Sequence, residues 1–591
     1  MQAAVFTGLL AMVGCHAAVD EGTTSDEVSG KRVAWANGAW SGRQAWYRTS
    51  QGSFLVDAEL FLALETAGSD APFASPASLE PLGFLYPPAG ETDLVDDPRL
   101  PLGVVRDTKP GSARADIGFT CAACHTGVVE TPTTRLLVDG GQSFLDLTRF
   151  LVTLRGALAA ADGPGAKQDR LCARLGKTDC KERIAAAHER VIGLVERNRE
   201  GEEGPGRVDA LTREANEIFA HQLASEPTYA LAAPISIPFV WDAPKLSCLQ
   251  TNCLPLDPLA RNVAEQIAVF GETRAHREGK RIVTEGTVEM ENLYRLENAL
   301  GSLPGPRWDE RALRPLDPAK VARGANVFAG ECAGCHTEPY RPDAPASAFV
   351  VEEAFGKTQR VWAATSSLPR EVATDSAFVD VHTSRFVSDP LLIDIFNRKL
   401  WNVAAATLGV DPDGALGGIV IGPAVLAAKA GLAAKGFYDW RGNPLELATY
   451  GALGDAVIDD ELARMEPDPA KRAALRERYV FGRKPAGGAT DLSKYKARPL
   501  DGIAFTAPFG HNGAWPTLEA VLTPPAERPR TFVIRPGSFD LTRIGLDTSA
   551  ARSGEYVFDT SAPGNGAGGH AYGTGLPRTE KDALLEYLAS L

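Results

Sequence analysis

Apolar residues recur at helical spacing along most of the chain, every three or four positions. This pattern predicts helices over residues 56–65, 143–161, 181–199, 207–223, 259–270, 288–303, 319–330, 390–408, 459–479 and 581–591. The helices at 181–199 and 207–223 carry charged faces, which predicts an exposed helical hairpin inserted into the first half of the chain. Few runs alternate strictly between polar and apolar positions. We therefore predict a mainly α fold with long loops and a few short strands.

Stretches that break the helical pattern divide the chain. Residues 71–115 are rich in Pro, Gly and Asp and predict a loop. Residues 304–318 contain four prolines and predict the boundary between two units, 33–310 and 311–591. The uncharged run 414–428 is too short to span a bilayer and contains Gly and Pro, so it predicts a buried helix or a loop.

Composition changes this picture little. The 591 residues are 44% hydrophobic and 23% charged, as in an ordinary soluble globular protein. The net charge of −14 argues against nucleic acid or an anionic membrane surface as a partner, and it fits a protein that meets a basic redox protein.

Two pentapeptides carry the chemistry, since residues 121–125 and 332–336 both read Cys-x-x-Cys-His. Two thiols at this spacing lie on one side of a helical turn and can form thioethers with a haem, while the adjacent His reaches the iron. With 9 Cys and 9 His in the chain, chance predicts about 0.002 such motifs. A zinc or dithiol site would need a further Cys or His pair or a βαβ pattern nearby. We predict two covalent c-type haems, and the residues that hold them are Cys121, Cys124, His125, Cys332, Cys335 and His336.

The N-terminus and the other cysteines predict an exported protein. Residues 1–15 form an uncharged, mostly apolar segment ending in Cys15, which is typical of a lipoprotein signal; a secretory signal with an incidental Cys is the alternative. Residues 16–32 predict a polar tether. Two close pairs predict disulfides in an oxidising compartment, Cys172–Cys180 and Cys248–Cys253, with buried thiols as the alternative. The expected location is periplasmic or secreted, with an outer-membrane lipoprotein anchored through Cys15 as the alternative.

The two haem motifs, with residues 507–518 (APFGHNGAWPTL) after the second, resemble the bacterial di-haem cytochrome c peroxidase superfamily. The chain length and the wide gap between the motifs most resemble its di-haem rubber oxygenase branch. The resemblance covers residues 46–65, 119–127, 236–241, 258–271, 292–336, 495–540 and 558–591. It implies two cytochrome c-like domains. It also implies that the N-terminal haem reacts with O2 or peroxide, and that the second, six-coordinate haem carries electrons.

The resemblance also implies ligands. His125 and His336 would be the proximal ligands. Peroxidases use a Met or Tyr soon after the His-x-Gly motif for the second iron, but residues 512–530 contain no Met, Tyr or His. The rubber oxygenase branch uses a His near the C-terminus, and the match is His570 in a Gly-rich stretch. His511 is the alternative sixth ligand, and Met465 is a weaker one.

Other residues are candidates for supporting roles. Trp241 could relay charge between the haems, or it could be an ordinary core residue. Phe119 could pack on the first haem, or it could equally be core. Arg498 and Lys496 are candidate partners of haem propionates.

Three functions remain open at this point. The first is an oxygenase that uses O2 to cleave a carbon–carbon double bond in an apolar substrate such as polyisoprene. The second is a peroxidase that takes electrons from a small redox protein and needs a distal Glu or Gln, which no motif identifies. The third is an electron carrier with two six-coordinate haems. Rubber oxygenases have a functional Phe shortly after the segment of Trp241, but here none follows before Phe270, so the substrate stays open.

Overall fold

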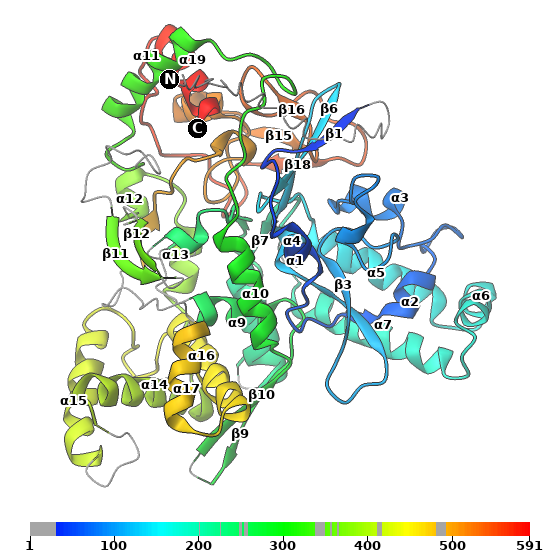
Figure 1. Ribbon diagram of the computed structural model, residues 1–591, viewed down its shortest axis with the longest axis vertical. Coiled ribbons are helices and arrows are strands. Elements are labelled where there is room, and N and C mark those ends of the chain that lie inside the picture. Colours follow the sequence, from blue (N-terminus) through cyan, green and yellow to red (C-terminus); the bar gives the residue numbers. More distant parts are fainter. Residues whose placement is uncertain are drawn as a thin grey trace, which may run out of the picture.

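The computed structural model describes residues 31–591 except 200, 202, 225, 247–250, 253–257, 280, 337–348, 355–356, 363–365, 411–416 and 480–491. The leader with Cys15, most of the tether, and the pair Cys248–Cys253 therefore lie outside the described residues. Helices dominate, with several small sheets between them (Figure 1). None of the described helices has the length and apolar character that crossing a membrane requires.

The first half of the chain combines a helical layer with two small sheets. Helices α5 (Leu147–Ala161), α6 (Ala166–Leu175) and α7 (Cys180–Arg197) pack together beside α2 (Ala58–Ala63), at the right of Figure 1. The disulfide Cys172–Cys180, with an S–S distance of 2.02 Å, joins α6 to the start of α7 and confirms that prediction.

Strands surround the first haem motif more closely than the sequence pattern predicted. The antiparallel sheet β2–β4–β3 consists of Val56–Asp57, Ala115–Phe119 and Val104–Thr108. The sheet β1–β6–β5 consists of Arg32–Trp35, Thr134–Asp139 and Thr126–Glu130. The loop prediction for 71–115 was thus wrong where β3 lies. Because the first residues of β3 and most of β5 are buried on both faces, they lack the alternation that would have revealed them.

The middle of the molecule is built from helices of both predicted units. Helix α8 (Ala210–Ala215) runs into a π-helix (Asn216–Gln222), next to α9 (Pro258–Ala268) and α10 (Met290–Gly301). Helix α16 (Glu446–Met465) packs on α9 and on the hairpin β9–β10 (Thr273–Glu278, Arg281–Gly286). The helix predicted over 459–479 is in fact the end of α16 followed by α17 (Pro469–Tyr479), because prolines interrupt it.

In the last part of the chain, α11 (Pro318–Glu331) lies along α19 (Arg578–Ser590) at the top of Figure 1. Gly324 permits this close packing, since a Cβ there would lie 2.1 Å from the carbonyl oxygen of Ala583. Strands β15 (Thr531–Ile534) and β18 (Tyr556–Asp559) form an antiparallel pair nearby. Helix α11 leads directly into the second haem motif.

The shorter elements complete the chain. The short helices are α1 (Arg43–Arg48), α3 (Pro76–Leu79), α12 (Pro369–Val372), α13 (Ala377–His382) and α18 (Leu518–Val521). The short strand pairs are β7–β8 (Arg207–Val208, Ile235–Ser236), β11–β12 (Phe349–Ala354, Lys357–Trp362), β13–β14 (Ser366–Ser367, Tyr495–Lys496) and β16–β17 (Phe539–Asp540, Gly545–Leu546).

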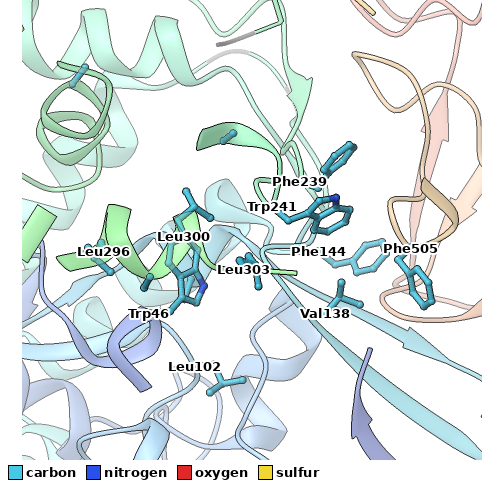
Figure 2. Packing of buried hydrophobic residues seen from close by; sticks show 14 of the residues in the cluster. Trp46, Leu102, Val138, Phe144, Phe239, Trp241, Leu296, Leu300, Leu303 and Phe505 are labelled. Carbon is cyan, nitrogen blue, oxygen red and sulfur yellow. The ribbon is translucent and has the colours of Figure 1, made fainter. Parts of the chain in front are cut away.

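One hydrophobic cluster joins the two predicted units. It contains Trp46 and Trp241 from the first unit and Phe505 from the second, and Figure 2 shows this packing around Leu300 and Leu303. The two haem motifs are therefore attached to a shared core.

A helical pair projects from this body. Helix α14 (Pro390–Leu408) has the predicted bounds, and it packs against α15 (Gly417–Ala433) at the lower left of Figure 1. The run 414–428 is thus largely helical, but the prediction that it is buried was wrong. Ile419 is 75% exposed and Leu426 is 71% exposed. The cause is that α15 makes its extensive contacts with α14 alone among the described elements.

Candidate di-haem site

Both Cys-x-x-Cys-His pentapeptides adopt the same tight turn. The His125 amide donates to the carbonyl of Cys121 at 2.9 Å, and the His336 amide donates to the carbonyl of Cys332 at 2.9 Å. The first pentapeptide forms the one-turn helix α4 (Cys121–Cys124), and the second begins where α11 ends. All four thiols are free of disulfides. Each turn therefore presents two thiols and an imidazole, the set that a c-type haem requires.

The imidazoles of the two motifs are held in the same way. The Nδ1 of His125 lies 2.8 Å from the carbonyl oxygen of Pro238, and the Nδ1 of His336 lies 2.8 Å from that of Arg498. A carbonyl can only accept, so Nδ1 carries the proton and Nε2 keeps its lone pair for a metal. Burial lowers the pKa of both rings, that of His125 to about 4, and favours the neutral form. Both rings thus keep a free Nε2 lone pair, which a haem iron could accept.

A single cavity of about 630 Å³ connects the two motifs. Its lining includes the cysteines and histidines of both pentapeptides together with Phe239, Lys496, Arg498, His511 and His570. Two haems held by these motifs would be neighbours in one space. That proximity is what electron transfer between them needs.

His570 faces His336 across this cavity. The centroids of the two rings are 6.2 Å apart and their planes are inclined by 59°. With metal–nitrogen bonds of roughly 2 Å, two imidazoles on opposite sides of one metal ion have centroids about 6.3 Å apart. Burial, with smaller effects from His336 and Arg528, lowers the pKa of His570 to about 4. The Nδ1 of His570 is buried and has no hydrogen-bond partner among the described residues. The spacing of the two rings fits a metal ion between them, so His336 and His570 would hold the iron of one haem.

The loop that carries His570 is held in an uncommon conformation. His570 has a φ of 45°, in the left-handed region that residues other than Gly seldom adopt. The guanidinium of Arg528 donates to the carbonyls of Gly569 at 2.7 Å and His570 at 3.1 Å, and the His570 amide donates to the carbonyl of Val372 at 2.8 Å. These bonds position the imidazole, because they fix the backbone on both sides of it.

The alternative ligands lie in other surroundings. His511 lines the cavity, but its ring packs on Tyr495 with centroids 4.5 Å apart. Burial lowers the pKa of His511 to about 4. Met465 is 46% exposed at the end of α16. The geometry favours His570 over both.

A short bridge formed by Pro238, Phe239 and Arg498 links the two proximal imidazoles. Pro238 accepts the hydrogen bond from His125, and the carbonyl of the next residue, Phe239, accepts one from the Nη2 of Arg498 at 2.5 Å. The guanidinium carbon of Arg498 lies 3.7 Å from the centroid of the Phe239 ring, and the Arg498 carbonyl holds His336. Because Phe239 and Arg498 lie 259 residues apart in the chain, sequence spacing alone gives no signal of this bridge.

Trp241 lies behind this bridge. Its ring stacks on Phe239 with centroids 4.4 Å apart, and its Nε1 donates to the carbonyl of Asp501 at 3.0 Å. It is completely buried, and Figure 2 shows it beside Phe239 in the core. Phe239 lines the cavity, whereas Trp241 contacts the cavity wall from inside the protein. The sequence thus indicated the right segment and named Arg498 as a candidate propionate partner, but it gave no sign of the contact between Phe239 and Arg498.

The positive groups of the cavity suit the propionates of haem. Lys496 and Arg498 both line it, and burial lowers the pKa of Lys496 far below its usual value and that of Arg498 to about 10. A cation that is removed from water is stabilised when an anion lies beside it. Haem carboxylates would supply that charge, so these residues fit the cofactor.

Two carboxyl groups near the first motif were not identified from the sequence. Glu265 on α9 and Glu214 on α8 line the cavity, and burial is the main cause that raises the pKa of each. Both carboxyl groups share this cavity with Cys121 and Cys124 of the first motif. Burial favours the protonated forms, so these groups can hold a proton close to the first haem site.

Aromatic rings complete the wall at the first motif. Phe119 and Phe270 both line the cavity and meet edge to face with centroids 5.2 Å apart. Phe270 has a φ of 62°, which is rare for a bulky residue. The sequence left open whether Phe119 packs on the first haem or belongs to the core, and it indicated no role for Phe270.

Comparisons with known proteins agree with a haem-binding chain. A family model described as RoxA-like, cytochrome c-like matches residues 494–533, the segment that contains Arg498, His511 and Arg528. A protein of Sinorhizobium fredii (strain NBRC 101917 / NGR234) named "Uncharacterized protein y4iJ" is 28% identical, and the match covers 95% of this chain and 93% of that protein. The matched segment is thus cytochrome c-like, which supports the rubber oxygenase-like branch and is consistent with a haem oxidoreductase.

Proposed function

We propose that the protein is an exported di-haem c-type cytochrome whose N-terminal haem activates O2 to oxidise an apolar substrate, while the C-terminal haem transfers electrons. The observation that carries this proposal is the difference between the two proximal histidines. His336 faces the ring of His570 at 6.2 Å, whereas no ring pair of this kind involves His125 among the described residues. One haem would be closed by two imidazoles, and the other would keep a side open for a reactant.

The residues of the chain have distinct tasks in this proposal. When bound, the haems supply oxygen activation at the first motif and electron transfer at the second. His125 and His336 donate their Nε2 lone pairs, while Pro238 and Arg498 orient the rings. Phe119 and Phe270 exclude water from the wall beside the first motif, as an apolar substrate requires.

Reduction of H2O2 is the second candidate, and Glu265 is the observation that favours it. Splitting peroxide to two waters consumes two protons and two electrons, so it needs an acid next to the reacting oxygen. Glu265 is a buried carboxyl whose pKa is raised and which shares the cavity with the first motif. In this reaction Glu265 would deliver the proton, and a small redox protein would supply the electrons.

Export is part of the proposal. Covalent haem motifs and the disulfide Cys172–Cys180 both suit an oxidising compartment. We propose a periplasmic or secreted location. The alternative to a free protein is an outer-membrane lipoprotein that carries its lipid at Cys15. O2 or H2O2, and an apolar substrate or a small redox protein, are the partners that this site would use.

Two assays on the purified holoprotein test the function. O2 consumption and carbonyl products are measured with polyisoprene latex and with shorter apolar polyenes, and H2O2 consumption is measured with a reduced small cytochrome. We expect O2-dependent formation of carbonyl products. Rapid peroxide turnover without such products would instead show that the protein is a peroxidase. If the protein reacts with neither O2 nor H2O2, its function would be electron transfer alone.

A further inference from the structure

Helix α15 exposes apolar side chains that no described part of the chain covers. Its residues 417–433 carry one charge, that of Lys429, and the helix is apolar on all sides. A helix of this kind is normally buried in a core or a membrane. Here Ile419 and Leu426 are 75% and 71% exposed, and Val403 of the adjoining α14 is 56% exposed. Ile419 and Leu426 are seven residues apart and so lie on one side of α15, and exposed apolar side chains that share a side of a helix can mark a site of interaction.

The C-terminal end of α15 adds groups that suit a membrane surface. Lys429 lies near the end of α15, and Lys435, Trp440 and Arg441 lie in the segment that follows the helix. Trp440 is 86% exposed, and the guanidinium carbon of Arg441 lies 4.6 Å from its ring centroid. The one carboxylate among residues 417–441, that of Asp439, accepts bonds from the amides of Arg441 and Asn443 within its own turn. Exposed Trp beside Lys and Arg is typical of the headgroup level of a bilayer.

We propose that α15, with Trp440 and its neighbouring cations, is a docking surface for a lipid bilayer with anionic headgroups. We call it the α15 surface, meaning Ile419, Val420, Leu426, Lys429, Lys435, Trp440 and Arg441. The apolar side chains would enter the boundary between headgroups and acyl chains, and the cations would stay among the phosphates. The helix would lie on the bilayer without crossing it.

The net charge of the whole chain opposes binding to an anionic surface, so only a locally cationic region could bind one. A protein of net charge −14 is repelled by an anionic surface in most orientations. Asp411 and Asp413 precede α15 in the sequence, whereas the cations follow toward its C-terminal end. A local cationic end on an acidic protein would therefore select one orientation at the membrane. A second copy of this chain would not offer a complementary charge, because two α15 surfaces in contact would bring like-charged Lys and Arg side chains together.

The test uses the full-length holoprotein with Cys15→Ser, so that no lipid anchor contributes. Vesicles of phosphatidylcholine alone, and of phosphatidylcholine mixed with phosphatidylglycerol, are floated with the protein at low and high salt. We expect binding to the mixed vesicles that weakens with salt. The double variant Ile419→Ser/Leu426→Ser should lower the bound fraction about tenfold or more. Because both side chains are exposed, haem spectra should stay unchanged.

Two comparisons decide the outcome. The control variant Ile192→Ser/Val557→Ser removes exposed apolar side chains elsewhere, at 37% and 46% exposure, and should bind like the parent. The variant Lys429→Glu/Lys435→Glu should lose the preference for mixed vesicles. The proposal is overturned if the parent does not float with vesicles, or if the α15 variant floats as well as the control. It is also overturned if the parent is a dimer without lipid that the α15 variant converts to a monomer.

Discussion

At the scale of single residues, His125 and His336 make the same kind of hydrogen bond but face different neighbours. Both rings hold Nδ1 against a backbone carbonyl, a contact that local sequence does not show because the partners are distant in the chain. The Cys-x-x-Cys-His spacing itself is local, so it could be recognised directly. His570 needed the family resemblance, since a single His in a Gly-rich loop has many possible roles.

His570→Ala should convert the second haem from a low-spin to a high-spin spectrum, because it removes the ring that faces His336. The change is followed by optical and electron paramagnetic resonance spectra of the oxidised protein. His511→Ala is the matched control, since His511 is also a buried histidine on the cavity but packs on Tyr495. A spectrum altered by His511→Ala and untouched by His570→Ala would assign the ligand to His511.

Glu265→Gln should separate the two candidate reactions. Cleaving a carbon–carbon double bond with O2 places both oxygen atoms in the carbonyl products and consumes no net proton, so O2-dependent turnover should change little. Peroxide reduction would instead fall about 10²–10⁴-fold through loss of the acid. In the parent protein that activity would decline as pH rises through the raised pKa of Glu265, where the carboxyl loses its proton.

Glu217→Gln is the control for this prediction. Glu217 lines the same cavity but pairs with Arg197, whose Nη2 lies 2.7 Å away. Equal effects of the two variants on peroxide turnover would show that cavity charge matters and that Glu265 has no special role. A large loss of O2-dependent activity in Glu265→Gln would count against proton-independent cleavage.

At the scale of elements, the helices were predicted well and the strands poorly. Helix α14 has the predicted bounds because its apolar face is regular and Pro390 begins it. Strands β3 to β6 around the first motif are short and largely covered, so they lack alternation. For helix α15, the predicted burial was wrong. Its composition predicted burial, but burial depends on what the rest of the chain places over it.

The contact between α11 and α19 gives a sharp test of packing. Gly324→Ala should destabilise the part of the protein around the second motif by about 1–3 kcal/mol, since the new Cβ would lie 2.1 Å from the backbone oxygen of Ala583. Thermal unfolding followed at the haem absorbance measures this. Gly156→Ala in α5, where a Cβ meets nothing closer than 3.9 Å, should be neutral or slightly stabilising. Equal unfolding temperatures for the two variants would refute the close contact.

At the scale of the whole molecule, a shared core and one cavity place the two motifs together. The predicted boundary at 304–318 separates the motifs in sequence, yet the largest hydrophobic cluster includes residues from both sides of it. This could not be read from the sequence, because periodicity reveals which face of a helix is apolar and not which helix covers it.

The bridge predicts a route for electrons between the two sites. Arg498→Met removes the hydrogen bond to the Phe239 carbonyl and the cation over its ring, while its backbone carbonyl can still hold His336. Electron exchange between the haems, followed by stopped-flow reduction, should become slower with axial ligation unchanged. Trp241→Phe keeps a stacked ring and should have a smaller effect. If Trp241→Phe slowed electron exchange more than Arg498→Met, the electron relay would be assigned to Trp241.

We propose that the two haems are unequal, one closed by His336 and His570 and the other open beside His125. The most direct measurement is the stoichiometry of carbon monoxide bound by the fully reduced holoprotein, with total haem counted independently. We predict one carbon monoxide for every two haems, and a second in His570→Ala. Two carbon monoxide molecules bound to the parent protein would mean that both haems are open, and none would mean that both are closed. Either result would show that the two haems do not differ in this way.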